Sequence, residues 1–348
     1  MPTAHILSFR LGGGDGVAIE AAKWAGALGL LGWEVRRVAG AGDGLDTELP
    51  GLAMDAPEPP TQAELTDALA AADLVVVENL CSLPLNPAAA RAVAAVCAGR
   101  PTLLHHHDLP WQRPHLADLP PPPDDAAWAH VTINQLSRSE LAGRGIQATT
   151  IYNTFDPEPP AGDRVATRGA LGLSDDIPLL LQPTRALARK NIPAALDMAE
   201  AVGGTYWLLG PAEDGYGPEL ERLVTRARCP VVLGEPEGGC SIADAYVACD
   251  LVLLPSSWEG FGNPSIESAT HRRALVISAY PVAAELAAFG FRWFSPTDPR
   301  PVAAWLGGPD EELLDHNHRV AADHFNLADL PGRLSRVLGR MEGLATTR

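Results

Sequence analysis

Two glutamates, Glu259 and Glu267, enclose a short glycine-containing segment, E-G-F-G-N-P-S-I-E, that follows a run of apolar residues. Gly260 and Gly262 let the backbone turn sharply and approach a ligand without a Cβ in the way. Asn263 is a favourable helix N-cap, and the proline after it suits the first helical position. Because free backbone amides and the positive end of the helix dipole meet at a helix start, the segment predicts a site for a diphosphate.

The two carboxylates suit different parts of such a ligand. Glu267 falls in the first turn of the predicted helix, where a carboxylate can accept hydrogen bonds from a ribose diol. Glu259 precedes the turn, at the end of a predicted strand, where it can meet sugar hydroxyls. The alternative is that Glu267 only complements the helix dipole and that Glu259 is a solvated loop residue. The combination of strand, glycines, helix cap and paired carboxylates favours the ligand site.

A cluster of basic residues lies in P-T-R-A-L-A-R-K-N, directly after another predicted strand. Arg185 is expected at the end of that strand and Lys190 at the start of the next helix. Two cations there can offset the negative charge of a bound anionic group, unless they form an ordinary solvated loop. Lys190 is one of only two lysines, with Lys23, among 26 basic residues. Its presence favours a role that needs a compact ammonium, although chance is the alternative.

Two further polar segments follow predicted strands of the first half. The glycine-rich turn L-G-G-G-D-G (11–16) does not match the G-x-G-x-x-G pattern of dinucleotide-binding folds. In H-H-H-D (105–108), side chains alternate along the strand, so His105 and His107 share one face and His106 points the other way. A metal site is conceivable there, with Asp108 as the nearest extra ligand, and a packed histidine is the alternative.

Alternating strands and helices must position these residues. The run D-L-V-V-V-E (73–78) is typical of a parallel strand that is covered on both faces. The first half predicts strands at 5–10, 34–38, 73–78, 101–107, 130–134 and 149–152, with helices at 17–32 and 88–98. The second half predicts strands at 178–182, 205–210, 230–233, 250–255 and 274–278, with helices at 192–202, 218–228, 242–248, 263–270 and 328–341. This alternation predicts two doubly wound parallel sheets, which bind ligands at the carboxyl ends of their strands.

Composition narrows the classes of function. A formal net charge of −17, with no window rich in Lys or Arg, argues against binding to nucleic acid or to an anionic membrane surface. The five cysteines are scattered without a C-x-x-C pair, so we expect neither disulfides nor a structural zinc site. No stretch approaches the roughly 20 apolar residues of a membrane helix, and the N-terminus does not match a secretory signal. We therefore expect a cytoplasmic protein without a stable membrane anchor.

The segment from Glu259 to Glu267 resembles the paired-glutamate signature of glycosyltransferase family 4, with seven residues between the carboxylates. Other landmarks match in the correct order over nearly the whole chain, including the family's Arg…Lys pair at Arg185 and Lys190 and its histidine at His107. The resemblance implies an α/β, GT-B fold, in which two doubly wound Rossmann-like domains face a central cleft. It also implies a retaining, metal-independent, hexosyltransferase-like enzyme that needs no cofactor and uses a nucleotide-diphosphate sugar as co-substrate.

The resemblance further implies roles for individual residues. His107 is preferred over His106 as a transition-state hydrogen-bond donor or an orienting group near the reacting centre. The expected catalytic residues are His107, Glu259, Arg185 and Lys190. The expected donor-binding residues are Gly13 and Gly14, acting through backbone amides, with Arg185, Lys190, Glu259, Gly260, Phe261, Gly262, Asn263 and Glu267. The expected acceptor-binding residues are Asp15, His106, His107 and Asp108.

We expect three segments: residues 1–156 as an acceptor-binding domain, 164–327 as a nucleotide-sugar-binding domain, and 328–348 as a helix that packs back towards the first domain. Residues 1–150 carry 9 Lys/Arg against 17 Asp/Glu, and they show no basic amphipathic helix, so we expect a soluble small-molecule or glycan acceptor.

The donor could carry uridine or guanosine. A nucleotide-sugar epimerase and a non-catalytic nucleotide-sugar-binding protein remain alternatives. Paired carboxylates also suit a glycoside hydrolase, although one of these two is expected on ribose.

Overall fold

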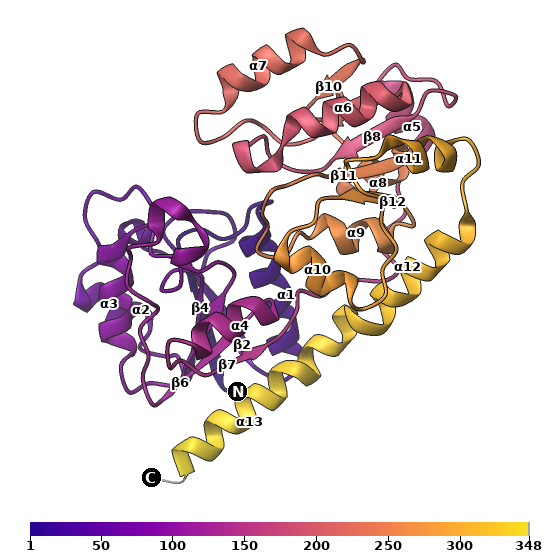
Figure 1. Ribbon diagram of the computed structural model, residues 1–348. Coiled ribbons are helices and arrows are strands. Elements are labelled where there is room, and N and C mark those ends of the chain that lie inside the picture. The colour runs from indigo at the N-terminus through magenta and orange to yellow at the C-terminus, as the bar shows by residue number, and fades with distance from the viewer. Residues whose placement is uncertain (347–348) are drawn as a thin grey trace. The chain divides into compact units, whose positions relative to one another are not determined.

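The computed structural model describes the backbone of residues 1–346 and the side chains of residues 1–341. The chain divides into two compact units. Unit 1 comprises Met1–Thr154 together with the C-terminal segment that starts at Leu327, and unit 2 comprises Phe155–Asn326 (Figure 1). Each unit contains one parallel sheet with helices packed on it, which is the doubly wound α/β arrangement that the alternating pattern predicts.

Unit 1 holds a seven-stranded sheet with the order β3-β2-β1-β4-β5-β6-β7, in which neighbouring strands are parallel. Its strands are β1 (Thr3–Ser8), β2 (Glu34–Ala39), β3 (Thr47–Glu48), β4 (Leu74–Glu78), β5 (Thr102–His106), β6 (Trp128–Thr132) and β7 (Ala148–Thr150). Its α-helices are α1 (Gly16–Leu30), α2 (Gln62–Ala68), α3 (Pro87–Cys97), α4 (Gln135–Ala142) and α13 (Leu330–Thr346), and 3-10 turns lie at Pro50–Leu52, Pro110–Gln112, Pro114–Leu116 and Leu327–Asp329.

Two apolar clusters explain why the central strands of unit 1 read as continuous apolar runs. On β4, Leu74 and Val76 join one cluster, and Val75 and Val77 join the other. Both faces of the strand are therefore removed from water, as expected for a parallel strand between two layers of helices. A polar residue in β4 therefore needs partners inside the protein, as Glu78 at the end of the strand has in His105 and His107.

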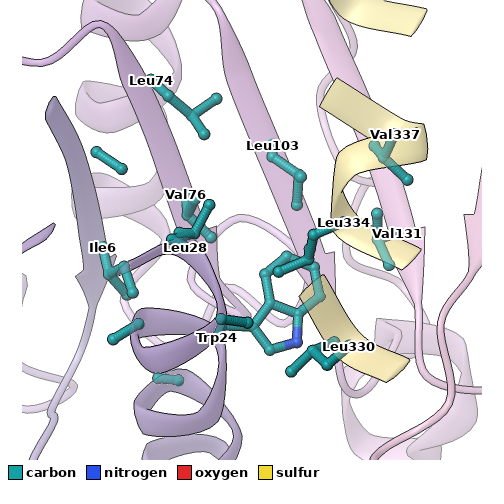
Figure 2. Close-up of a cluster of buried hydrophobic side chains, with 14 of the residues drawn as sticks. Ile6, Trp24, Leu28, Leu74, Val76, Leu103, Val131, Leu330, Leu334 and Val337 are labelled. Atoms are coloured by element: carbon teal, nitrogen blue, oxygen red, sulfur yellow. The ribbon is translucent and has the colours of Figure 1, made fainter. Parts of the chain in front are cut away.

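The helices α1 and α13 cover the first of these clusters together. Trp24 and Leu28 of α1 lie with Leu330 and Leu334 of α13 against strand residues of β1, β4, β5 and β6 (Figure 2). Trp24 is 1% exposed, and truncating a tryptophan buried in this way typically costs about 3–5 kcal/mol of folding free energy. The C-terminal helix therefore completes the core of unit 1, although about 170 residues of unit 2 precede it in the chain.

Unit 2 holds a five-stranded parallel sheet with the order β10-β9-β8-β11-β12. Its strands are β8 (Leu179–Gln182), β9 (Thr205–Leu208), β10 (Val231–Leu233), β11 (Leu251–Leu254) and β12 (Ala274–Ile277). Its α-helices are α5 (Arg164–Ala170), α6 (Ile192–Val202), α7 (Gly217–Arg226), α8 (Ile242–Ala248), α9 (Pro264–Thr270), α10 (Pro281–Ala287), α11 (Pro299–Leu306) and α12 (Glu311–His324), with a 3-10 turn at Ala188–Lys190.

The eleven predicted strands are all present, within a few residues of the expected ends. The sequence pattern missed the two-residue strand β3 and six helices, α2, α4, α5, α10, α11 and α12. The buried face of α12 carries the polar residues Asn317 and His318, which is why its pattern was not recognised. Asn317 hydrogen-bonds both the backbone amide and the carbonyl of Arg292, at 2.8 Å each, so tertiary contacts satisfy this polar face. Within residues 1–346, no helix is long and apolar enough to span a membrane.

Candidate functional site

The strand order of unit 2 reverses between β8 and β11, which pair directly with each other. In doubly wound sheets, ligands bind at such a switch point, beyond the carboxyl ends of the strands. Arg185, Arg189 and Lys190 follow β8, and Glu259 follows β11. The structure thus brings the two predicted charged clusters to the same end of two neighbouring strands.

Glu259 lies between two cations. Its Oε1 accepts a hydrogen bond from Lys190 Nζ at 2.6 Å, and its Oε2 accepts one from Arg189 Nη1 at 2.6 Å. Arg189 Nη1 also donates to the carbonyl oxygen of Trp258 at 3.1 Å. Glu259 is 6% exposed and Lys190 is 8% exposed. These residues therefore form a three-charge network in which Glu259 and Lys190 are buried and the side chain of Arg189 is 33% exposed. Neither Glu259 nor Lys190 is a solvated loop residue.

The network fixes the charge of its carboxylate. Burial raises the pKa of the Glu259 carboxyl, but the charges of Lys190 and Arg189 outweigh burial and hold that pKa below its usual range. Burial lowers the pKa of the Lys190 ammonium, and the charge of Glu259 opposes this effect. A buried ion pair is stable only when its hydrogen bonds are well made, and both carboxylate oxygens are paired here.

Glu267 lies in the first turn of α9, as predicted. Its Oε2 accepts a hydrogen bond from the hydroxyl of Tyr246 at 2.7 Å. Burial, followed by the nearby charge of Glu267, raises the pKa of Tyr246 well above its usual value, so the phenol stays protonated and donates. Tyr246 also stacks on His271, with ring centroids 4.5 Å apart. The Glu267 carboxylate is therefore oriented by α8, which carries Tyr246.

The segment between the two glutamates depends on Gly262. This residue has φ +88°, and a Cβ there would lie 2.6 Å from the hydroxyl of Tyr280, so only glycine fits. Phe261 is buried and packs against Phe155 and Phe325, with ring centroids 6.2 Å away in each case. Its side chain anchors the segment in the core of unit 2. Gly260 is half-buried and lies directly beside the buried Glu259.

The helix after Gly262 begins at Pro264, as predicted. The predicted side-chain cap is wrong, because Asn263 has helical angles (φ −44°, ψ −41°) and makes no capping hydrogen bond to α9. The residue already follows the helical path, so its side chain cannot reach back to the amides of the first turn.

The basic segment after β8 differs from the prediction in two ways. Arg185 is past the strand end, and its Nη1 donates to Glu213 Oε2 at 2.6 Å, with both side chains partly exposed. Lys190 ends a 3-10 turn, and α6 starts only after Asn191, which has φ +52°. Sequence reasoning missed Arg189, which is the arginine that pairs with Glu259. In the sequence, its position next to Lys190 was the one feature that could have indicated this role.

The glycine-rich turn of unit 1 follows β1, where the order of the seven-stranded sheet reverses between β1 and β4. Gly13 and Gly14 are exposed, and a Cβ at Gly14 would meet nothing within 4 Å, so the tip of the turn is open. Asp15 caps α1, because its Oδ1 accepts from two backbone amides of the first helical turn at 3.0 and 3.1 Å. The carboxylate expected to contact an acceptor is thus engaged in starting the helix.

The neighbouring strands β4 and β5 end in a buried Glu–His cluster. Glu78 Oε2 accepts hydrogen bonds from His105 Nδ1 and His107 Nε2, each at 2.8 Å. His105 and His107 therefore share one face of the strand, as the alternation predicts, and their ring centroids lie 4.3 Å apart. Burial raises the pKa of Glu78, but the two histidines outweigh it and hold the pKa at about 2. Glu78 was not among the predicted site residues, although it ends a buried strand as an isolated carboxylate.

His106 faces the other way and belongs to a different network. Its Nδ1 lies 2.5 Å from Ser82 Oγ, and its Nε2 lies 2.9 Å from His130 Nδ1. His130 Nε2 in turn lies 3.1 Å from an Asp124 carboxylate oxygen. Burial holds the pKa of His106 well below its ordinary value. His106 is fully buried, so it is not exposed for the acceptor contact predicted for it.

Glu78, His105 and His107 also form a group that could hold a metal ion. Each offers one ligand atom, and these atoms lie within 4.8 Å of one another. Two imidazoles and one carboxylate are a ligand set that zinc accepts in proteins. Asp108, the extra ligand considered from the sequence, instead pairs with Arg113 at 3.1 Å.

Solved structures define the class of fold. The chain superposes on HepE of Anabaena in complex with UDP-glucose with a TM-score of 0.74 at 18% identity, over 97% of this chain and 99% of that one. Sucrose-phosphate synthase from Thermosynechococcus elongatus gives a TM-score of 0.74 at 16% identity, over 99% and 100% of the two chains. WaaG, a glycosyltransferase involved in lipopolysaccharide biosynthesis, gives 0.67 at 14% identity, over 95% and 98%. The chain has the GT-B fold of two Rossmann-like units.

Curated relatives agree with this class. The chain is 25% identical to mannosylglucosylglycerate synthase of Thermotoga maritima, over 95% of this chain and 98% of that protein. It is 27% identical to the protein of the same name from Petrotoga mobilis, over 63% of this chain and 62% of that protein. No protein-family model matches the chain. The resemblance to glycosyltransferases of the family 4 type is confirmed, and the comparisons support a glycosyltransferase that uses a nucleotide sugar.

Proposed function

We propose that the protein is a retaining glycosyltransferase that moves a sugar from a UDP- or GDP-linked donor to a hydroxyl group of a small-molecule or glycan acceptor. The observation that carries this proposal is the charged network of Arg189, Glu259 and Lys190 at the switch point between β8 and β11. It combines cations suited to a diphosphate with a carboxylate suited to sugar hydroxyls, at the end of the sheet where nucleotides bind in such folds.

Each part of the donor has a proposed partner in unit 2. The carboxylate of Glu267 accepts hydrogen bonds from the ribose diol, in the orientation that Tyr246 imposes. Lys190, Arg185 and the backbone amides from Gly260 to Asn263 contact the diphosphate. Each carboxylate oxygen can accept more than one hydrogen bond, so Glu259 keeps acceptor capacity for sugar hydroxyls while paired with its two cations.

The proposed transfer takes place on one face of the sugar. The bond between the anomeric carbon and the leaving phosphate oxygen breaks, and the acceptor oxygen bonds to the same face of that carbon. The acceptor's proton moves to the leaving phosphate oxygen, so no protein base is required. The remaining negative charge develops on the diphosphate, where the cations of Arg185 and Lys190 stabilise it. Because these charges are supplied by side chains, we propose that the donor chemistry requires no metal and no other cofactor.

We propose that unit 1 binds the acceptor through the residues that follow β1 and β5. The name that the two relatives share, mannosylglucosylglycerate synthase, denotes a small glycoside as product, which supports a small soluble acceptor. HepE was solved with UDP-glucose, which supports a uridine-linked donor. The acidic composition of residues 1–150 is also compatible with a soluble, uncharged or weakly charged acceptor.

A thermal-shift screen followed by a transfer assay tests this proposal. UDP, GDP, ADP and their sugars are compared first, because a ligand that binds the native state raises Tm by mass action. The best donor is then incubated with candidate acceptors, and products are analysed for the configuration at the anomeric carbon. We expect one nucleotide class to stabilise the protein, and acceptor-dependent transfer with retained configuration.

Variants separate the proposed chemistry from folding. Glu259→Gln should lower transfer by at least 100-fold, because it removes the carboxylate and leaves the buried ammonium of Lys190 and the partly exposed guanidinium of Arg189 without their counter-charge. Glu200→Gln is the matched control, since Glu200 pairs with the exposed Arg228 in the same unit. Three outcomes would each overturn the proposal of a transferase. Release of free sugar without an acceptor would support a hydrolase, an epimerised nucleotide sugar would support an epimerase, and binding without turnover would support a non-catalytic binding protein.

A further inference from the structure

One polar residue, Gln182, ends the otherwise apolar strand β8. It is 0% exposed, as are the three leucines before it. Its Oε1 accepts a hydrogen bond from the hydroxyl of Tyr206 at 2.7 Å, and Tyr206 lies on β9, which pairs with β8. Its Nε2 donates to the backbone carbonyl oxygen of Lys190 at 3.0 Å. The amide of Gln182 therefore links the interior of the sheet to the backbone of a residue in the charged network.

The partners of Gln182 allow only one orientation of its amide. The carbonyl oxygen of Lys190 can only accept, so the NH2 group must face it and Oε1 must face Tyr206. Burial raises the pKa of Tyr206 well above its ordinary value, so the phenol stays protonated and donates. The Nε2 atom also lies 3.4 Å from Thr184 Oγ1. Both polar atoms of the amide are thus paired inside the protein, as a buried amide requires.

The turn that carries Arg189 and Lys190 is held by contacts outside itself. The carbonyl oxygen of Arg189 accepts a hydrogen bond from the backbone amide of Ser257 at 2.8 Å, on the segment after β11. The carbonyl oxygen of Lys190 is held by Gln182 at the end of β8. The chain then passes through Asn191 with φ +52°, a left-handed conformation that costs free energy at a non-glycine residue. Such a conformation persists when surrounding contacts impose it, and these two hydrogen bonds are such contacts.

These contacts fix Lys190 at both of its ends. Its carbonyl oxygen is held from β8, and its ammonium lies 2.6 Å from Glu259 Oε1, on the segment after β11. The stem of a lysine is flexible, so the position of the ammonium depends on where the backbone holds the Cα atom. Because Lys190 is 8% exposed, its side chain has little space in which to compensate for a displaced backbone.

We propose that Gln182 and Tyr206 are positioning residues, which form a buried relay that holds the backbone of Lys190 and thereby places its ammonium beside Glu259. Both residues are 0% exposed, so neither contacts a ligand directly. A misplacement of about 1 Å, caused by a change far from the reacting atoms, can lower a rate by about 100-fold. The role of this ammonium at a donor diphosphate rests on the proposed transferase function, whereas its placement beside Glu259 does not.

Lysine signals test the placement without turnover, because Lys23 and Lys190 are the only lysines of the chain. The full chain is labelled with 13C-lysine, and the Lys190 signals are identified by their loss in Lys190→Met. Gln182→Met keeps the length of the side chain and removes both hydrogen bonds. The shift difference between the two ε-protons of Lys190 should fall by about half or more, because the ammonium samples more positions. The signals of Lys23 should not move, and unchanged Lys190 signals in a folded Gln182→Met would overturn the proposal.

Tyr206→Phe is the milder variant and takes the place of Gln182→Met if that variant does not fold. It removes only the hydroxyl that bonds Gln182 Oε1, so it should change the same Lys190 signals to a smaller extent. Thr205→Val is the matched control, because it also removes a buried hydroxyl from β9, and Thr205 Oγ1 has no hydrogen-bond partner among the described residues. It should leave the Lys190 signals unchanged. Equal changes in Thr205→Val and Tyr206→Phe would indicate a general loosening of the sheet and overturn the relay.

A double-mutant cycle tests whether the relay acts through Lys190. In the wild type, Gln182→Met should lower kcat about tenfold, because it displaces a charge that stabilises the leaving diphosphate. In Lys190→Met, the same substitution should leave kcat nearly unchanged, because the ammonium that it displaces is already absent. Urea unfolding of each variant reports the loss of stability, which is expected in both backgrounds. An equal loss of kcat in both backgrounds would show that Gln182 is only structural and would overturn the proposal.

Nucleotide binding separates this inference from the proposed function. Calorimetry compares UDP with uridine, or GDP with guanosine if GDP is the nucleotide that stabilises the protein. Gln182→Met should weaken binding of the diphosphate about tenfold and leave binding of the nucleoside unchanged, because the relay acts through a charge on the diphosphate. Equal weakening of both ligands would overturn the proposal. If no nucleotide binds and no transfer occurs while the lysine signals change as expected, the proposed function fails and the placement of Lys190 stands.

Discussion

The ammonium of Lys190 lies 2.6 Å from a carboxylate oxygen of Glu259, although 69 positions separate the two residues in the chain. The other lysine, Lys23, makes the same kind of contact, at 2.5 Å from the buried Glu20. All Lys/Arg positions of the chain except these two are arginines. Both lysines place a compact ammonium against a buried glutamate. The planar guanidinium of arginine is larger and needs several acceptors, so the choice of residue is explained by the space and partners at each site.

The first prediction concerns Lys190. Lys190→Met removes one of the two cations on Glu259 and a cation proposed for the diphosphate, so kcat should fall by about 100- to 1,000-fold. Lys190→Arg should not restore activity, because the fork cannot reproduce a single point contact in the same buried space. Steady-state kinetics with the donor varied measure both effects, and Tm reports folding. Arg228→Met on the surface serves as control, and a folded Lys190→Met with more than a third of normal kcat would contradict the prediction.

The second prediction concerns the glycine between the paired glutamates. Gly262→Ala combines a disfavoured φ of +88° with a Cβ placed 2.6 Å from the Tyr280 hydroxyl, so it should destabilise the protein by about 2–4 kcal/mol. Urea unfolding measures the change. Gly169→Ala in α5 is the matched control, because a Cβ added at Gly169 would meet nothing within 4 Å, and it should be neutral or stabilising by up to about 1 kcal/mol. Equal effects of the two substitutions would show that the turn at Gly262 is not sterically restricted.

Local patterns were sufficient to predict the alternation of strands and helices, because central strands such as β4 and β11 are largely apolar and are followed by turns or helices. The same patterns located Glu267 in the first turn of α9 and Gly262 in the turn before it. These features depend on residues that are near one another in the chain. Propensity and spacing carry such information directly.

Contacts between distant residues could not be predicted in the same way. The spacing R-x-x-x-R-K did not decide which arginine faces Glu259, because that depends on a 3-10 turn that ends at Lys190. Likewise, nothing in the sequence pairs Glu78 with His107, which lies 29 positions later, until β4 and β5 are known to be neighbours in register. Strand order and register, rather than residue type, determine these partners.

The third prediction tests the orientation of Glu267. Tyr246→Phe removes the hydrogen bond to Glu267 Oε2 while keeping the ring that stacks on His271. A hydrogen bond to a charged group typically contributes about 1.5–3 kcal/mol, and part of this should appear as a roughly tenfold weaker Kd for the nucleoside diphosphate. Calorimetry with the preferred nucleoside diphosphate and its 2′-deoxy analogue measures the effect. The ratio of the two Kd values, which measures the preference for ribose over 2′-deoxyribose, should shrink in Tyr246→Phe and fall to about one in Glu267→Gln. An unchanged ratio in both variants would show that Glu267 does not contact the ribose.

The last prediction concerns acid stability and the buried pair of His106 and His130. Burial lowers the pKa of both imidazoles below 6.5, so between the folded and unfolded values the unfolded chain binds more protons than the native state. Stability therefore rises with pH in this range. The contribution of the pair is fully present above pH 6.5 and is lost as the pH falls below it. His107, whose pKa is raised, has the opposite sign, and its contribution is lost as the pH rises.

His130→Asn isolates this effect, because an amide can both donate and accept and so can still hydrogen-bond to His106 Nε2, while the variant removes one titrating group. One group can change stability by at most about 1.4 kcal/mol per pH unit, so the wild type should lose about 1 kcal/mol more than His130→Asn between pH 7 and pH 5. Urea unfolding at several pH values measures the difference. His5 and His271 also have lowered pKa values, so the comparison with the wild type, rather than the total slope, is decisive. Parallel pH profiles for the two proteins would mean that folding does not shift the pKa of His130, and they would contradict the prediction.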